Sequence, residues 1–290
     1  MKVTGFTIIR NALKFDYPVV EAITSVLPLC DEFVVAVGKS EDETLDLIKK
    51  IASPKIKIIE TLWDDHLREG GRVLALETDK AYRAISPDTD WCFYIQSDEV
   101  IHEQDYVAIR SAMEQYLDDK KVEGLVFNYH HFYGSYDYLG ASRKWYKQEV
   151  RIVRNIKNIY SYRDAQGFRI DVNRKLNVKS IAACVYHYGW VKHPKFQQAK
   201  QESFHKMWHS DEWMNKNIQR TSEFDYSQID SLKKFNGTHP QVIQERVKKQ
   251  NWKFDFDLSR DKIPLKYRLI GMLEALIRRD IGRYKNFRLI

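Results

Sequence analysis

Short apolar runs alternate with segments of helical periodicity over the first hundred residues. The runs are rich in β-branched and aromatic side chains, which is typical of buried strands. Asp16 and the capping-box pattern Ser40 to Glu43 precede two of the helical segments. This alternation predicts an α/β fold with a mostly parallel sheet flanked by helices. The expected strands are residues 3–9, 33–37, 57–60 and 90–95, and the expected helices begin near Asp16, after Glu43 and after Gly71.

Polar residues follow three of the expected strands. Ligands of open α/β sheets bind beyond the carboxyl ends of the strands, so chemistry is expected at these three places first. The segments are Arg10-Asn11, residues 38–42 and Gln96-Ser97-Asp98-Glu99.

The pattern changes after an expected helix at 106–117. Strands are predicted at 124–129 and 149–154, and between them residues 129–138 form a stretch that is too polar for a core strand and too aromatic for an idle loop. Aromatic side chains with polar tips suit sugar faces or a protein interface. We predict a catalytic domain over residues 1–194, with a nucleotide-sugar-binding half (1–100) and an acceptor half (101–194). A mainly helical extension over 195–290 would contain helices at 195–217 and 264–281.

Composition excludes several classes of protein. The 290 residues are 43% hydrophobic and 30% charged, which is the balance of a globular chain and excludes a disordered one. Cys30, Cys92 and Cys184 are too few and too widely spaced for a disulfide framework or a metal motif. No apolar run approaches a membrane span, and no signal peptide is evident. We therefore expect a cytoplasmic protein.

Most of the net charge of +7 lies near the C-terminus, since residues 260–290 carry nine Lys or Arg against three acids. No nucleic-acid-binding signature accompanies this charge, so no nucleic-acid partner is expected. The segment instead has a helical apolar stripe, which leaves two alternatives open: peripheral docking on an anionic membrane at the inner face of the cell membrane, or packing against the catalytic domain. The stripe is Leu265, Leu269, Met272, Leu273, Leu276 and Ile277, and the basic residues around it are Lys262, Lys266, Arg268, Arg278, Arg279, Arg283, Lys285 and Arg288.

The sharpest local signal is the pair of adjacent carboxylates Asp98 and Glu99 directly after an expected strand. Carboxylates in this place can hold Mg²⁺ or Mn²⁺, which prefer oxygen ligands and bridge to phosphates. They can equally cap the next helix, and spacing alone does not decide between the two roles.

The order of several motifs resembles that of a family 2 glycosyltransferase with the GT-A fold, of the bacterial surface-glycan type. The resemblance covers roughly residues 3 to 200, and its strength lies in the order rather than in any one motif. In that order Gln96 to Glu99 occupy the place of the family's DxD motif. The other matching segments are Arg10-Asn11, Ser40 to Thr44, Trp145-Tyr146, Glu149 to Asn155, Asp164 to Arg169 and Tyr186 to Val191.

This resemblance implies transfer of a sugar from a nucleotide-diphosphate-sugar donor to the hydroxyl of a glycan or lipid-linked acceptor, with inversion, in polysaccharide biosynthesis. It points to Asp164 as catalytic base, with Glu99 orienting the acceptor or replacing Asp164 as base. It implies Mn²⁺ or Mg²⁺ held by Asp98, with His187 as a further ligand. Donor-binding roles are implied for Arg10, Asn11, Gly38, Ser40, Asp42, Gln96, Asp98 and Lys192, and Lys200 is a second candidate for a diphosphate contact.

The chain departs from the family pattern at three places, one of which is Thr78-Asp79, where the family often has Arg-Asn. Gln96 stands where the family has the first Asp of DxD, and Gln is a weak metal ligand. Gly38-Lys39 stand where an Asp often contacts the base. Two other functions therefore remain as alternatives. One is a degenerate GT-A domain that binds glycan or protein. The other is a sugar-phosphate nucleotidyltransferase, against which the glycine-free segment Ile9 to Ala12 counts.

Overall fold

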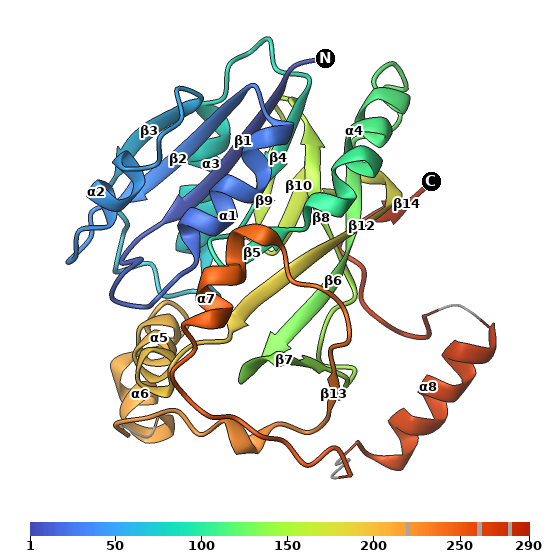
Figure 1. Cartoon of the computed structure of the whole chain (residues 1–290). Coiled ribbons are helices and arrows are strands. Elements are labelled where there is room, and N and C mark those ends of the chain that lie inside the picture. Colours follow the sequence, from blue (N-terminus) through green and yellow to red (C-terminus); the bar gives the residue numbers. More distant parts are fainter. Residues whose placement is uncertain (219–220, 260–262, 278–279) are drawn as a thin grey trace.

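The computed structural model describes residues 1–218, 221–259, 263–277 and 280–290 (Figure 1). Its main sheet begins with four parallel strands in the order β3-β2-β1-β4. Helices connect these strands along the chain, so the predicted α/β class with a helix-flanked parallel sheet is confirmed. The strands are β1 Val3–Ile9, β2 Glu32–Gly38, β3 Ile56–Thr61 and β4 Trp91–Tyr94, and the helices are α1 Val19–Val26, α2 Thr44–Lys49 and α3 Arg72–Arg83.

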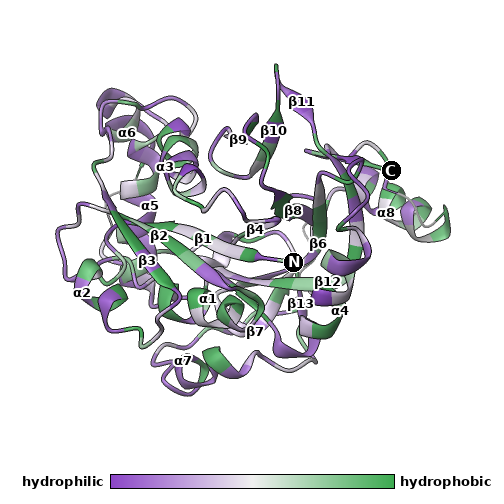
Figure 2. Cartoon of the chain, turned by 90° about the horizontal axis from the view of Figure 1, so that it is seen from above, coloured by the Kyte–Doolittle hydropathy of each residue, from purple (hydrophilic) through white to green (hydrophobic). Residues whose placement is uncertain are grey.

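Helices cover both faces of this parallel half, so β1, β2 and β4 are buried along almost their whole length. The edge strand β3 is only half-buried, and its Lys57 and Glu60 are exposed. Because side chains alternate along a strand, Phe6 and Ile8 of β1 join one core cluster with residues of α3. Val3 and Ile9 join the other cluster, with residues of α1. Figures 1 and 2 show α1 and α3 on opposite sides of β1 and β2. This packing fixes the carboxyl ends of the strands at one edge.

The sheet continues into a mixed half. β8 runs antiparallel to both β4 and β6, while β6 pairs in parallel with the long strand β12. β7 and β5 add antiparallel neighbours to β6 and β12, and β9 to β11 form a small separate sheet. The bounds are β5 Glu99–Ile101, β6 Gly124–Tyr133, β7 Ser135–Gly140, β8 Gln148–Arg154, β9 Ile159–Tyr162, β10 Gly167–Ile170, β11 Arg174–Lys175 and β12 Asn177–Trp190, with helix α4 Tyr106–Gln115.

The aromatic stretch 129–138 lies in strands β6 and β7, so the prediction that it was too polar for a core strand is wrong. Phe132 is fully buried, and Tyr133 and Tyr138 are nearly so. Tyrosines tolerate this burial when the hydroxyl finds a partner, and the Tyr138 hydroxyl donates to Asp255 Oδ1 at 2.8 Å.

The two expected N-caps also differ in the structure. Ser40 does not cap α2, because its Oγ accepts from the backbone N–H of Asn11 at 3.0 Å and donates to the carbonyl of Gly38. Asp16 has a positive φ of 48° and pairs with Arg246 rather than capping α1. Both side chains connect separate loops instead of capping the start of a helix.

The segment after residue 194 contributes strands as well as helices. β13 pairs with β7 and β14 pairs with β12, so the extension adds to the main sheet. The helix expected over 195–217 is divided into α5 and α6, and the domain boundary at residue 194 stays a prediction. The bounds are α5 Pro194–Lys206, α6 Asp211–Asn217, α7 Gln244–Lys248, α8 Leu265–Ile277, β13 Leu232–Lys234 and β14 Arg288–Leu289.

Helix α8 exposes its apolar stripe. Met272 is 68% and Leu276 is 80% exposed, whereas Glu274 on the other side is buried and pairs with Arg143. Both views place α8 away from the helices that cover β1 and β2 (Figures 1 and 2). The alternative in which the stripe packs on the catalytic domain is therefore contradicted. In the part of the chain that the structure describes, no helix is long and apolar enough to cross a membrane. Lys262, Arg278 and Arg279 lie outside the described residues.

Candidate functional site

A cavity of about 840 Å³ lies at the carboxyl ends of β1 and β4. Its wall is formed by the segments after β1, β3 and β4, the turn between β9 and β10, the end of β12, and the second half of α5. This volume lies within the range of small-molecule sites. Seven residues predicted from the sequence line it: Arg10, Asn11, Gln96, Asp98, Asp164, His187 and Lys200.

Asp98 forms a buried ion pair with Lys200 in this cavity. The Lys200 Nζ lies 3.0 Å from Asp98 Oδ2 and 2.9 Å from the carbonyl oxygen of Gly189, and the two charged side chains are only 12% and 13% exposed. Burial alone would raise the pKa of Asp98, but the positive charge of Lys200 outweighs it and holds this pKa well below its usual value. Asp98 is therefore an anion whose immediate counterion is an ammonium group.

His187 completes this group with a defined tautomer. The Nε2 of His131 faces the carbonyl oxygen of Tyr146 at 2.8 Å, so it carries the proton. The Nδ1 of neutral His131 then accepts from the Nδ1 of His187 at 3.1 Å. Burial lowers the pKa of both rings, which keeps them neutral. This leaves an unprotonated Nε2 on His187, 3.8 Å from Asp98 Oδ1.

Gly189 permits this close packing. A Cβ at this position would lie 2.7 Å from Asp98 Oδ2 and 2.6 Å from His187 Nε2, closer than side chains normally approach. Any larger residue would separate the two groups, so the glycine in Tyr188-Gly189-Trp190 has a structural reason at the site.

The donor set around Asp98 does not fit a divalent cation as it stands. Mg²⁺ requires oxygen ligands at about 2.1 Å, but Asp98 Oδ2 is in contact with Lys200. Gln96 turns its amide toward the carbonyl oxygen of Ala165, at 3.2 Å. Among the described residues no group of three His, Cys, Asp or Glu side chains is arranged to hold a metal. The expected Mn²⁺ or Mg²⁺ therefore stays a prediction, and no chemical step below depends on it.

Glu99 lies beneath the cavity and does not line it. It is fully buried in a two-pronged ion pair with Arg151, with Nε–Oε2 and Nη2–Oε1 distances of 2.8 Å. Its oxygens also accept from the Tyr129 hydroxyl and from the backbone N–H of Gln96. With both oxygens occupied, Glu99 has no free lone pair directed at a substrate. We reassign it from a catalytic to a positioning role.

Lys192 is likewise structural. Its Nζ donates to the carbonyl oxygens of Phe15 and Asp16 at 2.8 and 3.2 Å and is fully buried away from the cavity. It supports the loop that follows β1.

The expected donor residues Gly38, Ser40 and Asp42 act through their neighbours. A Cβ on Gly38 would lie 2.4 Å from the Trp63 ring, so this glycine makes room for a cavity residue. Ser40 binds the backbone of Asn11, as described above. Asp42 accepts from the backbone N–H of Lys14 at 2.7 Å. All three shape the wall without lining it.

Asp164 lines the cavity from the turn between β9 and β10. Its neighbours Arg163 and Ala165 both have positive φ, 57° and 62°, which is uncommon for side chains other than glycine and concentrates at functional sites. Burial raises the pKa of Asp164 above its usual value. A carboxylate with a raised pKa is a stronger base, so this residue combines access to the cavity with suitable chemistry.

Other cavity residues were not predicted. Trp63 and Asp65 follow β3, and Arg10 forms an ion pair with Asp65 and lies 5.7 Å from the centre of the Trp63 ring. Tyr17 and Trp190 supply further aromatic walls. The available signal was positional, because residues 61–65 also follow a parallel strand at the same edge of the sheet.

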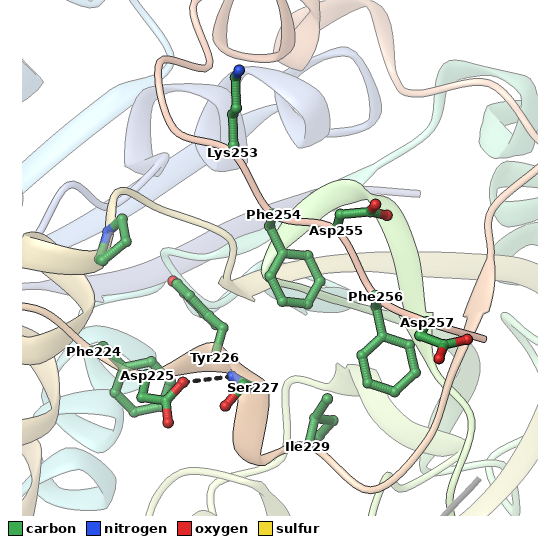
Figure 3. A pocket seen from close by; sticks show the side chains of 11 residues that line it. Phe224, Asp225, Tyr226, Ser227, Ile229, Lys253, Phe254, Asp255, Phe256 and Asp257 are labelled. Carbon is green, nitrogen blue, oxygen red and sulfur yellow. Dashed lines mark hydrogen bonds between the residues drawn. The ribbon is translucent and has the colours of Figure 1, made fainter. Parts of the chain in front are cut away.

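Figure 3 shows a second cavity, of about 330 Å³. Aromatic side chains, including Tyr226, Phe254 and Phe256, line it together with Asp225. The walls of the two cavities meet at one ring contact, since Trp190 lines the first, Phe224 lines the second, and their ring centroids lie 6.0 Å apart. Aromatic faces next to carboxylates can bind the apolar face and the hydroxyls of a sugar.

No protein-family model matches the sequence, and no curated protein matches it significantly. Solved structures give remote likenesses. S. aureus TarS 1-349 matches with 13% identity and a TM-score of 0.37 over 64% of this chain and 58% of that chain. The same protein in complex with UDP gives 12% and 0.38 over 77% and 68%. Glucosyl-3-phosphoglycerate synthase from Mycobacterium tuberculosis, in complex with Mn²⁺, UDP and phosphoglyceric acid, gives 19% and 0.30 over 44% and 43%. We infer no function from likenesses this remote.

Proposed function

We propose that the chain is a glycosyltransferase that moves a sugar from a nucleotide-diphosphate-sugar donor to an acceptor hydroxyl with inversion. One observation carries the proposal: a single cavity at the strand ends contains both a cation, the ammonium of Lys200 beside Asp98, and a carboxylate with a raised pKa, Asp164. Transfer of a glycosyl group from a diphosphate needs a positive charge for the leaving group and a base for the attacking hydroxyl.

The proposed reaction is a single displacement. The acceptor oxygen attacks the anomeric carbon while the bond from that carbon to the diphosphate oxygen breaks. The electron pair of the broken bond passes to the diphosphate, and the hydroxyl proton passes to Asp164. Attack from the face opposite the leaving group gives inversion. Arg10, Asn11 and Trp63 would bind the nucleotide end of the donor. They line the part of the cavity wall that is formed by the segments after β1 and β3.

We place a glycan acceptor in the second cavity. Support comes from its aromatic and acidic lining, and from the ring contact between Phe224 of its wall and Trp190 of the donor cavity. A chain of sugars bound there would have its terminal hydroxyl directed past Trp190 toward the donor.

We further propose that α8 docks on an anionic membrane surface. Its exposed apolar face meets the requirement for an interfacial helix, and the exposed basic residues Lys266 and Arg268 would face lipid headgroups.

Full-length protein should sediment with vesicles containing phosphatidylglycerol, and Leu276→Glu should weaken the affinity for these vesicles at least tenfold. A matched Leu62→Glu change at another exposed leucine should not. Equal vesicle binding by the Leu276→Glu and Leu62→Glu variants would refute the membrane as the partner. Dimer formation by a protein that does not bind vesicles would refute it as well.

A panel of nucleotide sugars tests the main proposal. Calorimetry should show that the purified protein binds one class of nucleotide sugar. Slow hydrolysis of that donor should then release the nucleoside diphosphate. Binding without release, in the presence of glycan acceptors, would favour the degenerate binding domain. Transfer of a nucleotidyl group to a sugar phosphate would favour the nucleotidyltransferase.

A further inference from the structure

We propose that Lys200 takes the place of a divalent metal ion, so that this chain binds the diphosphate of its substrate without Mg²⁺ or Mn²⁺. The inference rests on the proposed function for the identity of the substrate. Binding of a diphosphate by an ammonium group, however, depends neither on which sugar the donor contains nor on the role of Asp164. Lys200 would be a diphosphate-binding residue, and Asp98 and Gly189 would be its positioning partners.

The first support is the placement of Lys200. It lies on α5 and is separated from Asp98 by 102 residues, yet its Nζ meets both Asp98 Oδ2 and the carbonyl of Gly189. Within the described chain these contacts use two of the three N–H donors of the ammonium. Both Lys200 and Asp98 line the cavity, so the third donor can point to a ligand there.

The second support is the kind of site that Lys200 occupies. Asp98 and the unprotonated Nε2 of His187 are two electron-rich groups 3.8 Å apart, an arrangement that a nearby cation stabilises. The ammonium of Lys200, 3.0 Å from Asp98 Oδ2, supplies that positive charge. A divalent ion at Asp98 Oδ2 would have to displace Lys200 and leave its charge buried, which is unfavourable.

The charge balance also fits a diphosphate. Asp98 neutralises Lys200 when the cavity is empty, because the Nζ of Lys200 lies 3.0 Å from Asp98 Oδ2. An incoming diphosphate would add negative charge beside a lysine already held in place, so little side-chain ordering is needed on binding. The ring of Tyr17, whose centroid lies 5.0 Å from the Nζ, limits other positions for the lysine.

The experiment uses two probes that need no knowledge of the donor: Mn²⁺ alone, followed by electron paramagnetic resonance, and inorganic pyrophosphate in EDTA, followed by calorimetry. Wild-type protein should show no Mn²⁺ binding below about 1 mM and should bind pyrophosphate in EDTA. Lys200→Met should lose pyrophosphate affinity at least tenfold and gain a Mn²⁺ site that Asp98→Asn removes. Lys200→Arg should retain metal-free binding. Lys195→Met, an exposed lysine on the same helix, should behave as wild type.

Two results would overturn the inference. One is Mn²⁺ binding by wild-type protein that disappears in Asp98→Asn, together with pyrophosphate binding only when the metal is present. The other is no pyrophosphate binding under either condition. The Mn²⁺ titration of wild-type protein decides the metal question even if Lys200→Met does not fold. Lys200-dependent pyrophosphate binding by a protein that binds no nucleotide sugar would uphold this inference and refute the proposed function.

Discussion

Replacing Arg151 by Met should destabilise the fold by about 3–5 kcal/mol, the usual cost of removing one partner from a buried ion pair. Arg151 and Glu99 are both completely buried, and the arginine makes two 2.8 Å contacts with the carboxylate. After the substitution Glu99 would keep only the Tyr129 hydroxyl and the backbone N–H of Gln96. A carboxylate in apolar surroundings cannot be satisfied by two neutral donors alone.

Equilibrium urea unfolding of wild type, Arg151→Met, Glu99→Leu and the double variant measures this effect. Each single variant should lose about 3–5 kcal/mol, whereas the double variant should lie within about 1–2 kcal/mol of wild type because no unpaired charge remains. Lys248→Met, which breaks an exposed pair with Glu245, is the control and should cost less than about 1 kcal/mol.

A loss below about 1 kcal/mol in Arg151→Met would refute the argument, since it would mean that Glu99 is not held in a dry ion pair. Glu99 could then be free to act as a base. If the argument holds, any fall in activity of the stable double variant reflects the loss of the bond from Glu99 to the backbone of Gln96.

Two further predictions concern stability against pH and acceptor binding. Burial raises the pKa of Glu149 to about 8, so its contribution to stability is complete below its usual pKa and is lost as the pH rises through 8. The unfolding free energy should fall by up to about 1.4 kcal/mol per pH unit between pH 5 and 8 from this group, and Glu149→Gln should remove that slope; an unchanged slope would contradict the assignment. Phe256→Ala, in the second cavity, should raise KM for a glycan acceptor about tenfold, which corresponds to 1.4 kcal/mol, with donor affinity unchanged; a changed donor affinity and an unchanged KM would exclude the cavity as acceptor site.

The parallel half of the fold could be predicted because β1, β2 and β4 are buried on both faces and the edge strand β3 still contains three isoleucines. A strand such as β1, Val3–Ile9, can then be recognised from its own apolar and β-branched residues, without knowledge of the strands that it pairs with. The strands of the second half carry mixed polar and aromatic residues, and their burial depends on distant partners such as Asp255 for Tyr138. Strands could therefore be predicted at 124–129 and 149–154, within β6 and β8, but the aromatic stretch 129–138 was not recognised as strand.

The candidate site divides in the same way. Residues directly after strands, such as Arg10 and Asp98, could be located because the sheet edge brings them together. The different roles of two neighbouring acids could not be predicted, because Arg151 buries Glu99 while Lys200 holds Asp98 beside the cavity. Local spacing contains no information about partners 52 and 102 residues away.

The most direct test of the central claim is the rate of glycosyl transfer by Asp164→Asn with the donor that the panel identifies. The variant keeps the size of the side chain but cannot accept the proton. We predict that transfer falls by about 10²-fold or more, the usual scale for loss of a general base, while the affinity for the donor stays within twofold of wild type. Transfer within a few-fold of wild type at unchanged donor affinity would contradict the account.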